Sequence, residues 1–139
     1  MLDLLITNAT LPDGRQSISV AVRDGRIVEV APGLQAPAHE TIDAGGLLLS
    51  PPFVDAHFHL DSALTYGQPR VNASGTLLEG IALWAELKPT LTHEAIVERA
   101  LAYCDGAVAQ GLLAIRSHVD TSDPRLLAVQ ALLDVKQRV

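Results

Sequence analysis

The first fifty residues alternate between short apolar runs and turn signals, a pattern typical of β-strands. The runs LLITNA, SISVAV and RIVEVA are separated by the turns PDG and RDG. The dipeptide Asp24-Gly25 lies between two apolar runs and favours the positive φ angles of a tight hairpin. Another short pair of strands, TIDA and LLLS, is expected around Gly45 and Gly46. Residues 1–50 are therefore predicted to form a small antiparallel β-sheet.

From Pro51 onward the pattern changes, and predicted strands alternate with predicted helices. The run FVDAHFH predicts a strand, residues 60–75 a polar loop, and TLLEGIALWAELK a helix that ends before Pro89. A second helix is expected over residues 93–110, with Thr92 as its N-cap. The strand LLAIRSHVD follows, and its nearly continuous apolar start is typical of a parallel strand that is covered on both sides.

A third helix is expected over RLLAVQALLDVKQ, capped by Ser122 or Asp123, with Pro124 in the first turn where its missing N–H costs nothing. The alternation indicates an α/β fold, and it matches the first two strand-helix units of a (β/α)8 barrel or of another parallel sheet. A complete barrel needs about 250 residues. Residues 51–139 would thus supply two of eight units, and the chain is expected to be truncated.

Composition and charge argue against nucleic-acid binding, membrane association and secretion. Of the 139 residues 48% are hydrophobic, and 16 acidic residues against 10 scattered basic ones give a formal net charge of -6, which predicts no nucleic-acid partner. No apolar run approaches the roughly 18 residues that span a bilayer, so no membrane association is expected. The N-terminus carries Asp3 and no basic region, unlike a secretory signal, which favours a cytoplasmic protein.

Cys104 is the only cysteine in the sequence. An internal disulfide and the zinc signatures built on paired cysteines are therefore excluded. Cys104 is predicted to pack in the core, because no cation or helix N-terminus near it in sequence would stabilise a thiolate. Any metal site in this chain must use histidine and carboxylate ligands.

The motif DAHFH places two histidines at the carboxyl end of a predicted strand. Residues two apart project from the same face of a strand, so His57 and His59 should point into one space while Phe58 points away. Imidazole is a favoured ligand of divalent zinc and iron. Asp55 and Asp61 flank the pair and are candidates to orient the two rings. The pattern predicts that His57 and His59 bind a metal ion.

The stretch SPPFVDAHFHLD resembles the first barrel strand of the amidohydrolase superfamily, whose members place such a histidine pair there to bind a catalytic metal. The stretches HLDSALTYGQP, SGTLLEGIALWAELK, LTHEAIVERA and RSHVDTSDP resemble the cytosine deaminase branch. The resemblance covers residues 50–139 and implies the N-terminal portion of such an enzyme. It also implies that residues 1–50 are part of an accessory β-sandwich domain and that residues 51–139 open the barrel domain.

The resemblance implies one divalent ion, Fe2+ or Zn2+, held by His57 and His59. Hydroxide formed at that ion would attack the amidine-like carbon of a small heterocyclic base such as cytosine, and ammonia would leave. The family's general acid/base glutamate, a later histidine ligand and a late-strand aspartate have no counterpart in this sequence. No catalytic residue is therefore expected within residues 1–139, and the chain alone is predicted to be inactive.

Other residues are candidates for the walls of the substrate pocket. His118 and Asp120 follow the second predicted strand and would face the same barrel mouth as the histidine pair, where His118 has either a pocket role or a structural one. The resemblance implies that the backbone at Leu77 lies over the bound base. Trp84 and Tyr103 are predicted to pack against strands. The remaining histidines, His39 and His93, are not expected to bind metal. Arg116 alternates with His118, and a buried arginine at this position would need a carboxylate partner.

Two other functions remain open. Within the superfamily, the alternative is hydrolysis of a cyclic or N-acyl amide, which opens a carbon-nitrogen bond without releasing ammonia. Outside it, the chain is a non-catalytic fragment or interaction module. In either case the unpaired edges of the predicted parallel strands favour a homo-oligomer or association with the remainder of a barrel.

Overall fold

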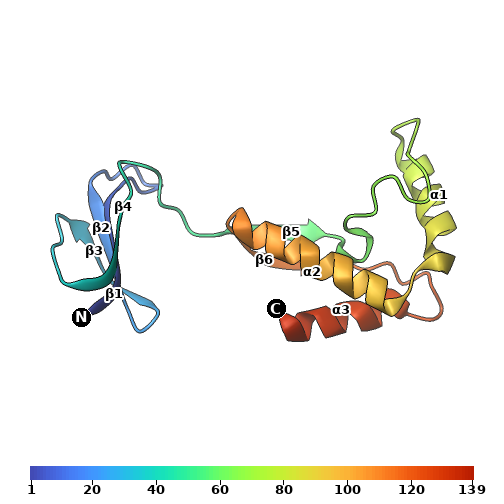
Figure 1. The fold of residues 1–139 in the computed structure, drawn as a ribbon. Coiled ribbons are helices and arrows are strands. Elements are labelled where there is room, and N and C mark those ends of the chain that lie inside the picture. Colours follow the sequence, from blue (N-terminus) through green and yellow to red (C-terminus); the bar gives the residue numbers. More distant parts are fainter. The chain divides into compact units, whose positions relative to one another are not determined.

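The computed structural model describes residues 1–139 and divides them into two compact units, Met1–Pro51 (unit 1) and Pro52–Val139 (unit 2). Figure 1 shows that unit 1 consists of strands and connecting loops, whereas unit 2 combines strands with helices. None of the helices combines the length and hydrophobicity that spanning a bilayer requires.

Unit 1 is a four-stranded sheet in the order β3-β2-β1-β4. Its strands are β1 (Leu2–Ala9), β2 (Ile18–Arg23), β3 (Arg26–Pro32) and β4 (Ala38–Asp43). Strands β1, β2 and β3 form an antiparallel meander, but β4 pairs with β1 in parallel. The prediction of an antiparallel sheet is wrong for this edge, because the chain crosses over after β3 and joins the free side of β1.

The predicted strand pair around Gly45 and Gly46 is also wrong. The two glycines have φ angles of 58° and 83° and turn the chain alongside the end of β1 rather than back onto β4. The backbone of Thr10 then donates to Leu47 at 2.9 Å and accepts from Leu49 at 2.8 Å. The LLLS run therefore extends the parallel edge, with a single bridge between Thr10 and Leu48.

The hairpin predicted at Asp24-Gly25 is confirmed. Asp24 has a φ of 52° and Gly25 a φ of 67°, the combination that a primed two-residue turn requires. The Gly25 N–H donates to the Asp3 carboxylate at 3.1 Å, which ties the hairpin to the first strand. The small core of unit 1 is aliphatic and consists of Leu2, Leu5 and Ala21 with Leu34 and Ala38 packed against them.

Unit 2 begins with the predicted order of strand, helices, strand and helix. The parallel pair is β5 (Phe53–Phe58) and β6 (Leu112–Ser117), and the helices are α1 (Leu77–Leu87), α2 (His93–Ala109) and α3 (Leu127–Arg138). Short 3-10 turns cover Leu60–Ser62 and Lys88–Thr90. Helix α2 packs against α3 and β6, as Figure 1 shows. The mixed α/β class is therefore confirmed for this unit.

The core of unit 2 lies between α2, α3 and one face of the strand pair. Its buried members are Leu60, Leu87, Leu91, Ile96, Val97, Ala100, Ala128, Ala131 and Val135. Phe58 stacks on Tyr103 of α2 with ring centroids 4.2 Å apart, so Tyr103 packs on a strand as predicted. Phe53, Val54 and Leu113 are exposed. The prediction that the second strand is covered on both sides is therefore wrong. Helix α2 packs on one face of the β5-β6 pair, and side chains on the other face are exposed.

Of the two helix caps predicted from the sequence, the one at Thr92 is found, and Thr76 caps α1 without having been predicted. Thr92 accepts from the Ala95 N–H at 3.2 Å, and Thr76 accepts from the Glu79 N–H at 3.3 Å. The predicted capping of the third helix is wrong. Asp123 accepts instead from the backbone and guanidinium of Arg125, so its carboxylate is already engaged. Helix α3 starts at Leu127 without a side-chain cap.

Candidate metal centre

His57 and His59 lie where the alternation of strand β5 puts them. His57 is within β5, and His59 directly follows its last residue, with φ of -121° and ψ of 88°. Their ring centroids are 5.8 Å apart. Both residues are exposed, whereas the intervening Phe58 turns toward the core. The two imidazoles therefore share one open side of the strand.

His118 joins this pair. Its backbone N–H donates to Phe58 at 2.7 Å, which extends the contact between the strands beyond the end of β6. Its ring stacks on His57 with centroids 3.9 Å apart, and Nδ1 is buried without a hydrogen-bond partner. The predicted strand LLAIRSHVD is too long, because β6 ends at Ser117 and leaves His118 and Asp120 in the following loop.

The histidine pair fits a divalent metal in donor type and in separation. Two imidazole nitrogens bonded to one ion at about 2.1 Å keep their ring centroids within about 6.5 Å of each other. The rings of His57 and His59 meet this condition. The face-to-face stacking of His118 on His57 is not a shared-ligand geometry. No group of three or more His, Cys, Asp or Glu side chains is placed to hold an ion, so the pair is an incomplete site.

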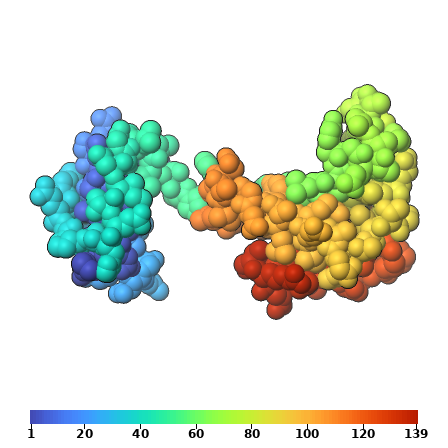
Figure 2. All heavy atoms as spheres, in the orientation of Figure 1, coloured from blue at the N-terminus to red at the C-terminus, as the bar shows by residue number.

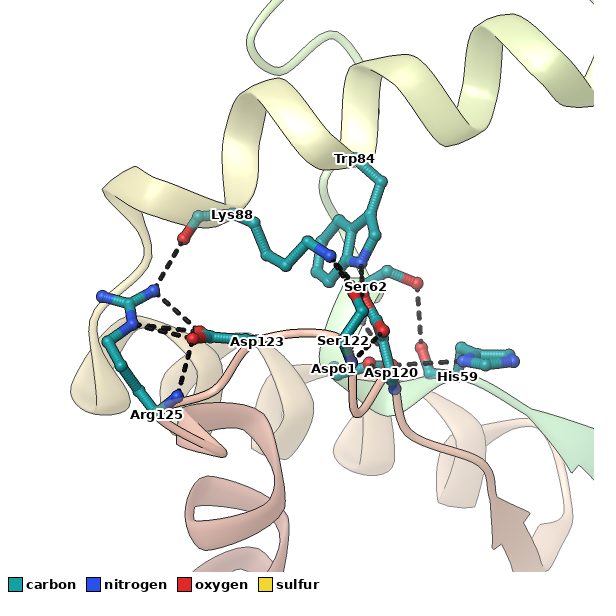
Figure 3. A network of polar contacts seen from close by, with 9 residues as sticks. All are labelled: His59, Asp61, Ser62, Trp84, Lys88, Asp120, Ser122, Asp123 and Arg125. Atoms are coloured by element: carbon teal, nitrogen blue, oxygen red, sulfur yellow. Dashed lines mark hydrogen bonds and ion pairs between the residues drawn. The ribbon is translucent and has the colours of Figure 1, made fainter.

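The two flanking aspartates contact different parts of the pair. Asp55 Oδ1 accepts from the backbone N–H of His57 at 3.0 Å. Asp61 Oδ1 lies 3.4 Å from the ring nitrogen Nδ1 of His59, a contact drawn in Figure 3. The Asp61 side chain is 1% exposed, whereas that of His59 is 47% exposed. Asp55 therefore binds the backbone of His57, whereas Asp61 faces the imidazole ring of His59.

Arg99 of α2 supports the loop that carries Asp61. Its guanidinium donates to the backbone carbonyls of Ala63 at 3.1 Å and of Asp61 at 3.2 Å. Burial lowers the pKa of Arg99, and attraction to the Asp61 charge opposes that effect. Sequence reasoning missed this residue, because an arginine within an amphipathic helix gives no sign of which distant carbonyls it will reach.

Asp120 is the centre of a second polar cluster. Its Oδ2 accepts from Trp84 Nε1 at 2.7 Å and from Lys88 Nζ at 2.8 Å, and Ser122 donates through both its N–H and its hydroxyl. The Lys88 ammonium, more than any other group, holds the pKa of Asp120 well below its usual range. Figure 3 shows that Trp84 and Lys88 reach this carboxylate from the end of α1. Nothing in the sequence indicated that Lys88 or Ser122 would contact Asp120.

A hollow of about 770 Å³ opens between α1 and the loops after β5 and β6. His59, Leu77, Trp84 and Asp120 are among its lining residues, whereas His57 and His118 are not. In the space-filling view of Figure 2, the yellow-green segment that leads into α1 stands up from the body of unit 2. Leu77 is 79% exposed, so this wall of the hollow offers apolar surface to whatever occupies it.

The remaining candidates lie outside this arrangement. Arg116 is exposed, so it needs no buried partner. Cys104 is half-buried against the core, and burial raises the pKa of its thiol, which keeps it protonated at neutral pH. His93 Nε2 of α2 lies 4.0 Å from Asp134 Oδ2 of α3, and His39 is exposed in unit 1.

Comparison with known proteins gives consistent results. The model of the amidohydrolase family matches residues 40–137. The solved 5-methylcytosine deaminase of Klebsiella pneumoniae, liganded with 5-fluorocytosine, is 42% identical and superimposes with a TM-score of 0.87, over 96% of this chain and 33% of that one. The chain thus spans about a third of that protein.

Two curated relatives have other activities in their names. The N-isopropylammelide isopropyl amidohydrolase of Pseudomonas sp. (strain ADP) is 32% identical over 142 residues, which cover 99% of this chain and 35% of the relative. The N-acyl-D-aspartate deacylase of Alcaligenes xylosoxydans xylosoxydans is 46% identical over 67 residues, 45% of this chain and 13% of the relative. All three proteins are hydrolases that act on carbon-nitrogen bonds.

Proposed function

This chain belongs to the amidohydrolase family, and from that premise we propose that it forms the N-terminal part of a metal-dependent deaminase of cytosine or a closely related heterocyclic base. The observation that carries the proposal is the 42% identity with a 5-methylcytosine deaminase over 96% of this chain.

In this proposal His57 and His59 supply two ligands to one divalent ion, Fe2+ or Zn2+. Members of the family generally depend on a divalent metal. When bound, such an ion supplies Lewis acidity that brings the pKa of a coordinated water toward neutrality. The hollow beside His59 would receive the flat ring, with the exposed apolar side chain of Leu77 and the indole of Trp84 as walls.

The described residues do not complete this chemistry. Two imidazoles are too few ligands, and no carboxylate joins them to form a three-ligand group. The family resemblance puts the remaining ligands and the general acid/base on later strands. We therefore expect the 139-residue chain alone to release no ammonia from any base, and the activity belongs to the protein completed by those strands.

A substrate panel tests the proposal. The complete protein, purified with its native metal, is incubated with cytosine, 5-methylcytosine and isoguanine, and ammonia release is followed. Rapid metal-dependent release from at least one base is the expected result. A complete protein that releases no ammonia from these rings would contradict it.

Matched variants connect that activity to the histidine pair. H57A and H59A should each lower both metal content and ammonia release by at least a hundredfold. H39A makes the same chemical change at an exposed position in unit 1 and should leave both unchanged. Full metal content in H57A or H59A would remove these residues from the metal site.

Hydrolysis of an N-acyl amide is the second candidate. It is favoured by the 46% identity with the N-acyl-D-aspartate deacylase, although that match spans 67 residues. The same panel separates the two functions when it includes an N-acyl amino acid and a cyclic amide. Release of a free amine or ring opening without ammonia would identify this activity.

A further inference from the structure

We infer that Asp61 is a positioning residue that selects the tautomer of the neutral His59 ring with its proton on Nδ1, so that the Nε2 lone pair of His59 is the one available to a metal. The inference rests on the proposed metal role of His59. It is carried by the contact between the buried Asp61 carboxylate and the Nδ1 side of the half-exposed ring.

The Asp61 carboxylate is buried and needs hydrogen-bond donors. Its side chain is 1% exposed, and a buried carboxylate is stable only when its oxygens are paired. Oδ2 accepts from the Asp120 N–H at 2.8 Å, and Oδ1 accepts from the Ser62 N–H at 3.1 Å. His59 Nδ1 is the side-chain group that faces Oδ1 in addition.

The charge of the carboxylate decides which nitrogen of His59 carries the proton. A neutral imidazole has one N–H and one lone pair. A lone pair on Nδ1 at 3.4 Å from Oδ1 would face the lone pairs of an anionic oxygen, whereas an N–H there is attracted to it. The proton is therefore favoured on Nδ1, and the lone pair lies on Nε2.

Asp61 is prevented from turning away by contacts on both of its sides. Arg99 holds its backbone carbonyl from α2, and the Asp120 N–H holds Oδ2 from the loop after β6. Asp120 is in turn fixed by its own bonds from Trp84 and Lys88. The position of the Asp61 carboxylate beside His59 is thus fixed by elements distant in sequence.

Asp55 provides the natural contrast. It flanks the histidine pair at the same spacing in sequence, but its carboxylate accepts from the backbone N–H of His57 and has no ring contact among the interactions of the structure. An asparagine at position 55 keeps an oxygen for that hydrogen bond. Only Asp61, therefore, requires its charge for the proposed role.

The first experiment measures the protonation of His59 without any metal. The metal-free 139-residue chain, labelled with 15N in its imidazoles, is studied by NMR at about pH 8.5, where a model imidazole is neutral. His59 is assigned by comparison with an H59Q sample. Predominant protonation at Nδ1 is the expected result, and predominant protonation at Nε2 overturns the inference without recourse to any variant of Asp61.

The second experiment compares D61N with D55N. D61N removes the negative charge that attracts an N–H at His59 Nδ1, so the fraction of His59 protonated at Nε2 should rise. D55N should keep the wild-type pattern. A wild-type pattern in a folded D61N, verified by circular dichroism, would contradict the inference.

Metal affinity provides an independent measurement. Co2+ is titrated against a chelator into the complete protein, and D61N should bind 10–100-fold more weakly than wild type and D55N. Equal affinities in D61N and D55N would contradict the positioning role. If the complete protein fails to deaminate any base but binds Co2+ through a His59 protonated on Nδ1, the proposed function fails while this inference stands.

Discussion

The polar side chains of the two units are used in different ways. In unit 1 they cap turns at the surface, as when Asp13 pairs with Arg15 two residues later and Asp43 accepts from the Gly45 N–H. In unit 2 the carboxylates of Asp61 and Asp120 are partly or fully buried and connect segments that are more than thirty residues apart.

Aromatic residues show the same division. The single Trp, both Tyr and both Phe lie in unit 2, and the core of unit 1 is purely aliphatic. Unit 1 is thus a sheet stabilised by backbone pairing and small apolar side chains. In unit 2 the polar contacts set the geometry next to the histidine pair. Long-range buried polar contacts, rather than the number of charges, distinguish the unit that carries the candidate site.

The largest expected effect is that of D61A. Removal of this carboxylate leaves the Asp120 and Ser62 N–H groups without their acceptor and the Arg99 charge without its nearby anion. We expect unit 2 to lose about 3 kcal/mol of unfolding free energy. Urea unfolding followed by Trp84 fluorescence measures it, because unit 1 contains no tryptophan. A loss below about 1 kcal/mol would show that Asp61 resembles the surface carboxylates of unit 1.

D120A should have the next largest effect. The side chain of Asp120 is 23% exposed, so water can partly replace it for Lys88, but the Trp84 N–H loses its acceptor. We expect a loss of about 2 kcal/mol in the same urea experiment, with a shifted emission maximum for the native Trp84. Unchanged emission would mean that the indole does not depend on this carboxylate.

Lowering the pH should reduce the difference in unfolding free energy between wild type and D120N. The lowered pKa of Asp120 means that its ionised form stabilises the folded state above the unfolded pKa of about 3.9, and that this contribution is lost as the pH falls through the folded value. Urea midpoints measured from pH 5 down to pH 2 should therefore converge. The pKa of Glu79 falls to about 2, chiefly through its hydrogen bond with Ser74. Because Glu79 is present in both proteins, its contribution to the pH dependence cancels in the difference between them. A constant gap between the two proteins would contradict the assignment.

The smallest effect is expected for D13A in unit 1. Asp13 and Arg15 form an exposed pair within one turn, and such pairs contribute little. The unfolding free energy should change by less than about 0.5 kcal/mol, measured by far-ultraviolet circular dichroism, which reports on the sheet. A larger loss of unfolding free energy would show that surface carboxylates of unit 1 stabilise the fold as strongly as the buried carboxylates of unit 2.

Local chemistry made much of the fold predictable. The hairpin at Asp24, the N-cap Thr92 and the end of α1 before Pro89 each depend on residues adjacent in sequence, and each is found. The parallel pairing of β4 with β1 was missed, because its partners lie far apart and alternation alone does not specify direction. The Asp123 cap failed because Arg125 competes for the same carboxylate.

The candidate site was predictable to the same extent. The spacing of His57 and His59 is a local property of one strand, and it was enough to predict that the two rings share one side of that strand. The stacking of His118 on His57 depends on the alignment of β5 with β6. The convergence of Lys88 and Trp84 on Asp120 depends on where α1 ends relative to that loop, which no spacing in the sequence encodes.

The parallel pairings also have a consequence for the order of folding. The meander of β1, β2 and β3 closes through short turns, whereas β4 reaches β1 by pairing Ala38 with Leu2, and β6 reaches β5 by pairing Leu112 with Phe53. Closing the longer of these two loops costs about 0.4 kcal/mol more chain entropy than closing the shorter one. Non-local pairings slow folding. We therefore expect the meander to form first and the β5-β6 pair, which aligns the candidate site, to form last.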